Sequence, residues 1–177
     1  MEKAISYWQM AGFFFTSVVG TLLHFLFGWT GGSPIAALFS AVNESIWEHL
    51  KLLFYPMLIF AFIEYRAWGK DKPSFWCIKL WCILLGLVLI PVAYYTYTGA
   101  LGIKADWLNI ALFFVVAGLV YWVETKWFLS ERQCSMCSKA SLILLFLMAA
   151  TFTVLTFVPI RIPLLQDPLS GTYGFQW

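Results

Sequence analysis

Charge is scarce in this sequence, and its scarcity excludes several classes of protein. Only 11% of the 177 residues are Asp, Glu, Lys or Arg, whereas a water-soluble domain has roughly a quarter. Hydrophobic residues make up 62%, and the mean hydropathy is +0.81. The net charge of +2 comes from scattered residues, so there is no basic stripe of the kind that binds nucleic acid. The composition is that of an integral membrane protein, whose first partner is the lipid bilayer.

The sequence also lacks a polar segment long enough to form a soluble domain. Five long apolar runs fill most of the chain, and each has about the 20 residues that a helix needs to cross a bilayer. The runs do not alternate between polar and apolar residues, which excludes a membrane β-barrel. We therefore predict an all-α, polytopic transmembrane helix bundle, with spans at 5–27, 44–65, 75–95, 107–127 and 140–160.

Two shorter segments complete the predicted layout. Pro34 is suited to begin a helix over 35–42, which is too short to cross a bilayer and is expected to be re-entrant or interfacial. Residues 161–177 form a tail that has few charges and many apolar side chains, so we expect it to be ordered and to pack on the bundle.

Lysine and arginine are unequally divided between the two ends of the predicted spans. Cytoplasmic loops of membrane proteins are enriched in these residues. With the N-terminus in the cytoplasm, eight lie inside and three outside, so we predict an internal N-terminus and an external C-terminus. The inner residues are Lys3, Arg66, Lys70, Lys72, Lys79, Lys126, Arg132 and Lys139, and the outer ones are Lys51, Lys104 and Arg161.

Cysteine is sparse as well, and the four cysteines fall near the predicted inner ends of the spans. They are Cys77, Cys82, Cys134 and Cys137. Because cytoplasmic thiols stay reduced, we expect no structural disulfide. The single C-x-x-C pair, Cys134 and Cys137, has no second pair and no nearby histidine. We interpret these cysteines as spare or acylated thiols in preference to half a zinc site or a redox pair.

The sequence contains none of the HExxH, GxSxG, P-loop or GxGxxG signatures of enzymes and nucleotide-binding proteins. It does contain a dense polar run at the predicted outer entrance of the second span, residues 43–51, Asn-Glu-Ser-Ile-Trp-Glu-His-Leu-Lys. Ionisable residues in or beside a bilayer need compensation and often mark a functional site. This run is therefore our candidate site.

Ordinary helix chemistry explains part of this run. Asn43 is a suitable N-cap, and Glu44 in the first turn would complement the helix dipole. Glu48 and Lys51 have the spacing of an ion pair on one helix. His49 is left without a structural role. Because Glu44 and Glu48 are four residues apart, we expect both carboxylates to share a face and to enter the bundle together.

Residues elsewhere in the chain are expected to reach the same level. His24 lies one turn below the outer end of the first span, where a hydrogen bond to another helix is its simplest role. The tail is expected to fold over the outer mouth as a lid. The predicted ligand-binding set is Glu44, Glu48, His49, His24, Asn43, Asp167 and Tyr173, and the candidate metal ligands are His24, His49 and Glu48.

These residues also carry a resemblance to known families. Residues 43–45 and 47–51, Pro56 and the closing motif at 167–174 resemble a family of small polytopic bacterial membrane proteins of unknown function. That likeness spans nearly the whole chain and implies the bacterial inner membrane, but it implies no activity. Residues 46–50 are also similar to an Ile-Trp-Thr-His-Leu run of the progestin and adipoQ receptor/hemolysin III family. That family's late histidine pair is absent here, so its zinc site cannot be carried over.

Three functions remain open at this point. The first is binding or transport of a small polar or cationic ligand in an outward-facing Glu/His pocket. The second is a membrane-embedded hydrolase or transferase acting on a lipid, using a bound metal or Ser45 activated by His49. The third is a structural or assembly subunit whose polar residues hold helices together. The sequence does not specify a cofactor, the ligand or the oligomeric state.

Overall fold

The computed structural model describes residues 2–103, 105–130, 132–134 and 136–176, with the side chain of Asp106 excepted. Lys104, which was counted above on the outer side, and Trp177 of the predicted tail lie outside this part of the chain. The long helices are α1 (Glu2–Trp29), α3 (Ile46–Ala67), α4 (Phe75–Tyr95), α5 (Asp106–Leu129) and α6 (Ser138–Phe157). Shorter elements are α2 (Pro34–Ala37), η1 (Gly69–Asp71), the π-helical η2 (Thr96–Ala100) and η3 (Pro163–Leu165).

The described residues form an all-α bundle without strands, as predicted. Five of its helices are long and apolar enough to cross a membrane, with η2 extending the span of α4 to Ala100. The chain is thus a membrane protein by the length and composition of its helices. The observed α3 begins at Ile46, two residues later than the predicted span, and this small shift changes the candidate site described below.

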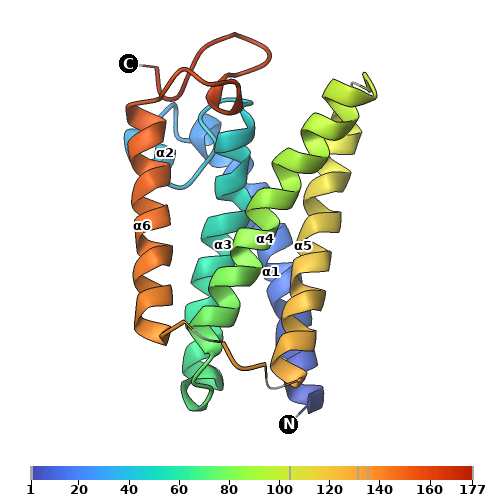
Figure 1. Ribbon diagram of the computed structural model, residues 1–177. Coiled ribbons are helices and arrows are strands. Elements are labelled where there is room, and N and C mark those ends of the chain that lie inside the picture. The colour runs from blue at the N-terminus through green and yellow to red at the C-terminus, as the bar shows by residue number, and fades with distance from the viewer. Residues whose placement is uncertain (1, 104, 131, 135, 177) are drawn as a thin grey trace.

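Helices α3 and α4 form the centre of the bundle. Most residues of their spans are buried, whereas only 22–28% of the residues in the spans of α1, α5 and α6 are buried. Helix α1 packs on α3 and α5, and α6 packs on α3 and α4. Figure 1 shows α6 on one side of this centre and α1 with α5 on the other, with the two termini at opposite ends of the bundle. The exposed residues of the three peripheral helices are largely apolar, as a lipid-facing surface requires.

Glycines allow the central helices to approach closely. A Cβ atom on Gly20 of α1 would lie 2.6 Å from the carbonyl oxygen of Leu52 in α3. A Cβ on Gly86 of α4 would lie 2.7 Å from the Leu53 side chain. Small residues at such contacts are typical of helix packing in membranes, where close van der Waals contact replaces the hydrophobic effect.

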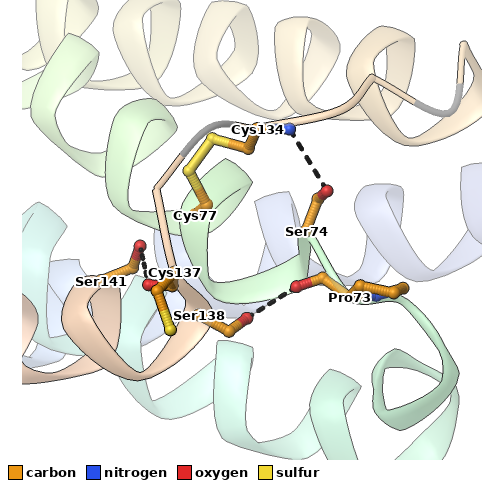
Figure 2. The surroundings of a disulfide bond; sticks show 7 residues. All are labelled: Pro73, Ser74, Cys77, Cys134, Cys137, Ser138 and Ser141. Atoms are coloured by element: carbon orange, nitrogen blue, oxygen red, sulfur yellow. Dashed lines mark hydrogen bonds between the residues drawn. A yellow bond between two sulfur atoms is a disulfide. The ribbon is translucent and has the colours of Figure 1, made fainter.

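A disulfide between Cys77 and Cys134 closes the lower end of the bundle, which contradicts our expectation of reduced thiols. Figure 2 shows that it joins the first turn of α4 to the loop that precedes α6. Two hydrogen bonds hold the same loop: the Cys134 N–H donates to Ser74 Oγ, and Ser138 Oγ donates to the Pro73 carbonyl. Our expectation rested on the compartment alone, whereas the fold brings the two Cα atoms to 6.2 Å, a distance that a disulfide spans.

The C-terminal tail is folded against the upper end of the bundle (Figure 1). The Phe175 N–H donates to the Thr156 carbonyl at the end of α6, and the Phe175 ring packs against Phe27 and Phe157. Gly174 permits this contact, because it adopts a φ of +55° and a Cβ atom there would collide with the Thr156 carbonyl oxygen.

We predict that Gly174→Ala detaches the tail from the bundle, since the new methyl group meets both a steric clash and an unfavourable backbone conformation. The matched control is Gly171→Ala, which has a similar φ of +72° but no heavy atom nearer than 3.9 Å to the added Cβ. Amide hydrogen exchange at Phe175 should accelerate strongly in the first variant and much less in the second. Equal acceleration in both would mean that the contact with Thr156 does not hold the tail.

Candidate functional site

Ser45 is the N-cap of α3. The prediction that Asn43 would be the N-cap was wrong. Ser45 Oγ accepts a hydrogen bond from the Glu48 N–H, and Asn43 Oδ1 accepts one from the Ser45 N–H. Asn43 therefore stabilises the turn that leads into the cap. Because α3 begins only at Ile46, Glu44 lies outside the helix and does not share a helical face with Glu48.

Glu48 points into the protein, where only 1% of the residue is exposed. Its carboxylate lies 2.6 Å from the ammonium of Lys51, which is fully buried as well. Glu48 also accepts hydrogen bonds from Thr156 Oγ1 and from the Val42 N–H. Lys51 donates to the Ala37 carbonyl and to Thr156 Oγ1. This Glu48–Lys51 pair, named the outer ion pair after its predicted side of the membrane, ties α3 to α6, to α2 and to the segment after α2.

Glu44 instead lies beside the two histidines of the chain. Its carboxylate is 3.4 Å from His49 Nε2, and the ring centroids of His49 and His24 are 5.2 Å apart. One donor atom from each of the three residues falls within 4.8 Å of the other two. Glu44 and His49 are partly exposed, with 47% and 34% of their side chains accessible, so the cluster is open to the outside of the bundle.

The hydrogen bonds around this cluster leave ring nitrogens free to coordinate an ion. The Ser45 carbonyl can only accept, so the Nδ1 of His49, 2.9 Å away, carries the proton and donates it. In the neutral imidazole, His49 Nε2 then presents a lone pair, which is the arrangement found around metal-bound histidines. His24 Nδ1 is buried and has no partner among the described residues. Two imidazoles and a carboxylate form a ligand set that suits divalent transition metals such as zinc.

The predicted site residues are thus divided into separate groups. His24, Glu44 and His49 converge, whereas Glu48 is paired with Lys51. Asn43 bonds to the tail, because its Nδ2 donates to the Gly174 carbonyl.

The two tail residues of the predicted set bond within the tail itself. Asp167 accepts from the Leu169 N–H and from Ser170 Oγ, and Tyr173 forms a backbone bridge with Gln166. The tail therefore reaches the candidate site through Gly174.

Sequence reasoning missed a second buried cluster, near the opposite end of the bundle. Lys79 of α4 forms ion pairs with Glu64 of α3 and Glu124 of α5. Gln9 of α1 donates a hydrogen bond of 2.8 Å to Glu64. All four side chains are at most 2% exposed. The signal was present in the sequence, because each charged residue lies inside a predicted span, but Lys79 was counted as a charge of the inner surface.

A helical bundle with five potential spans and buried ion pairs defines a polytopic membrane protein. The model of a family of unknown function (DUF6512) matches residues 1–175. The chain belongs to this family, which confirms the resemblance to a family of unknown function over nearly the whole chain. The motifs that carried the resemblance and its bacterial source stay predictions. No curated protein and no solved structure matches the chain. The local likeness to the hemolysin III family stays a prediction.

We predict that Glu48→Gln lowers the free energy of unfolding by about 3–5 kcal/mol, because the substitution leaves Lys51 buried without its counter-charge. The matched control is Glu44→Gln. Glu44 is exposed and outside the helix, so its substitution should change stability by no more than about 0.5 kcal/mol. Equilibrium unfolding of the detergent-solubilised protein checks both values. A similar small effect for both variants would contradict the role assigned to the outer ion pair.

Proposed function

We propose that this protein binds a divalent transition-metal ion at the outer mouth of the bundle through His24, Glu44 and His49. The observation that carries the proposal is the convergence of two imidazole nitrogens and a carboxylate oxygen within 4.8 Å. Donor atoms on one zinc ion lie within about 4 Å of each other, since each bond is about 2.0–2.2 Å long. Small rotations of the partly exposed side chains would close the remaining gap.

The electrostatics of the site favour a cation. Glu44 supplies the only formal charge of the trio, because a coordinating imidazole is neutral. The nearby carboxylate of Glu48 is already neutralised by Lys51. A bound divalent ion would therefore carry excess positive charge, which an open coordination position facing water can accommodate with solvent ligands.

A metal-dependent hydrolase is the second candidate. Two histidines, a carboxylate and an open position are the ligand set of several catalytic zinc sites. The alternative in which His49 activates the Ser45 hydroxyl has less support. His49 contacts the Ser45 carbonyl, and the Ser45 hydroxyl is buried against the Glu48 N–H. We therefore place the ion, and not the serine, at the centre of the proposed chemistry.

Binding of Co²⁺ to the purified protein tests the proposal, since this ion reports its ligands by visible absorption. We expect saturable binding that is displaced by Zn²⁺. The variants His24→Ala, His49→Ala and Glu44→Gln should each weaken it at least about 10-fold, the lower bound seen even for outer-shell changes. The experiment is done in a Cys137→Ser background, because that exposed thiol would otherwise bind the probe.

Asp167→Asn is the matched control for this experiment. It removes a carboxylate from the same end of the bundle without touching the trio, so Co²⁺ affinity should be unchanged. Equal binding by wild-type protein and all three ligand variants would refute the metal site.

We also propose that the N-terminus lies in the cytoplasm and the candidate metal site faces outward. Lys51 and Lys79 are buried and should not be counted as surface charges. Removing them from the count leaves seven basic residues at the inner end and two at the outer end. The excess of basic residues at the inner end therefore remains and supports the same orientation. The Cys77–Cys134 disulfide lies at that end and favours the opposite orientation, so the two observations make the labelling test decisive.

Thiol labelling provides the test of orientation. Cys137 is the exposed free cysteine, and Cys82 is buried. Backbone N–H groups of Lys139 and Ala140 at the start of α6 lower the pKa of the Cys137 thiol. Its thiolate should therefore form, and react with an impermeant maleimide, at a lower pH than that of an ordinary thiol. We expect this labelling only after cells are permeabilised.

Leu169→Cys in the tail supplies the opposite control, because Leu169 is strongly exposed at the other end of the molecule. This variant should be labelled in intact cells. Labelling of Cys137 in intact cells would reverse the orientation, and it would place the Cys77–Cys134 disulfide in an oxidising compartment.

A further inference from the structure

The second buried cluster, which lies at the proposed cytoplasmic end and is called the inner cluster here, brings together polar side chains from four helices: Gln9, Glu64, Lys79 and Glu124. Glu64 from α3 accepts through one oxygen from Gln9 and through the other from Lys79. Glu124 from α5 accepts from Lys79 through Oε1. The cluster is fully buried and lies about one turn or more inside the ends of its helices, so protein groups must satisfy its charge.

The formal charges of this cluster do not balance. Two carboxyl groups face one ammonium. The Lys79 ammonium also lies 5.5–5.9 Å from the ring centroids of Phe75, Tyr121 and Phe128. Aromatic faces favour a cation at this distance, so Lys79 is held as the charged ammonium. With both carboxyls ionised, one negative charge would be left uncompensated in a dry interior, at high energetic cost.

The hydrogen bonds of the cluster show which oxygen atoms have no donor. Both oxygens of Glu64 are bonded, whereas Glu124 Oε2 is buried without a partner in the described structure. Gln9 Oε1, in the same cluster, is also an acceptor without a partner. A proton on Glu124 Oε2 would neutralise the excess charge and supply a donor to a cluster that has surplus acceptors.

We propose that the Glu64–Lys79–Glu124 cluster is a proton-binding site that holds one proton on its carboxyl pair. The site is separate from the metal site at the opposite end of the bundle. Its ligand is a single exchangeable proton, of the kind that carboxyl groups carry in membrane proteins that bind or move protons.

The outer ion pair provides an internal comparison. Glu48 and Lys51 are one carboxyl and one ammonium, and both carboxylate oxygens have donors. That pair is neutral without a proton. Lys51 and Lys79 therefore occupy sites of different kinds. The charges around Lys51 sum to zero, whereas the cluster around Lys79 needs one additional proton to become neutral.

Other titratable groups close to the inner cluster do not supply the missing charge. Tyr121 of α5 is hydrogen-bonded to Thr16, and Cys82 of α4 lies within electrostatic range of Glu124 and Lys79. A phenol and a thiol are uncharged in the neutral range, so neither offsets the excess negative charge. Gln9, from α1, is not titratable.

Infrared spectroscopy of the purified protein at neutral pH tests the proposal. The wild type should show the carbonyl band of a protonated carboxylic acid, shifted in heavy water. Glu124→Gln and Glu64→Gln should each abolish the band, because one carboxylate against one ammonium needs no proton. Glu44→Gln, at the opposite end, should leave the band unchanged.

The outcomes are distinct even if a variant fails to fold. Absence of the band from the wild-type protein would overturn the proposal without any substitution. Persistence of the band in both folded Gln variants would assign the proton elsewhere and overturn it as well. Loss of the band in either variant, with the Glu44→Gln control intact, would support it. None of these results depends on Co²⁺ binding, so the two proposals stand or fall separately.

Discussion

The structure depends on one constraint: a charge inside an apolar bundle must be compensated by the protein, because no water is available there. Two lysines meet this requirement in different ways. Lys51 is enclosed by a carboxylate, a hydroxyl and a backbone carbonyl, and these contacts tie α3 to α6 and to α2. Lys79 draws together acidic residues of α3 and α5. The ion pairs thereby specify which helices are neighbours, a selection that uniform apolar surfaces provide poorly.

The same constraint separates the polar residues at the entrance of α3 into two groups. Glu48 turns inward and neutralises Lys51, so its carboxylate is not available to the histidine cluster. Glu44, outside the helix and exposed, stays with the histidines and gives the cluster its negative charge. At the other end of the bundle, the inner cluster has an excess of carboxyl groups instead. The proposed metal and proton sites thus lie at opposite ends of the bundle, and helices α1 and α3 contribute residues to both.

Particular residues show how far the sequence could be interpreted. The five spans followed from apolar runs of sufficient length, because a bilayer permits almost only helices of that length. The shared face of Glu44 and Glu48 was wrong, because it assumed a helix that begins two residues too early; Ser45, not Asn43, is the cap. The disulfide was missed because the compartment was considered without the distance between Cys77 and Cys134. Glu64 and Glu124 are ionisable residues inside predicted spans, which often mark a functional site, but they were overlooked.

Apolar length and helix punctuation are local properties, so the sequence was sufficient to establish the all-α class, the approximate spans and the polar entrance of α3. Pairing is different, since it depends on which side chains meet after the helices have packed. The spacing of Glu48 and Lys51 on one helix had already indicated their ion pair. Only the tertiary structure decided that His24 joins Glu44 and His49, and that Lys79 faces two carboxyls. Those partners lie on separate helices or on opposite sides of a helix start, and residue spacing along the chain carries no information about such contacts.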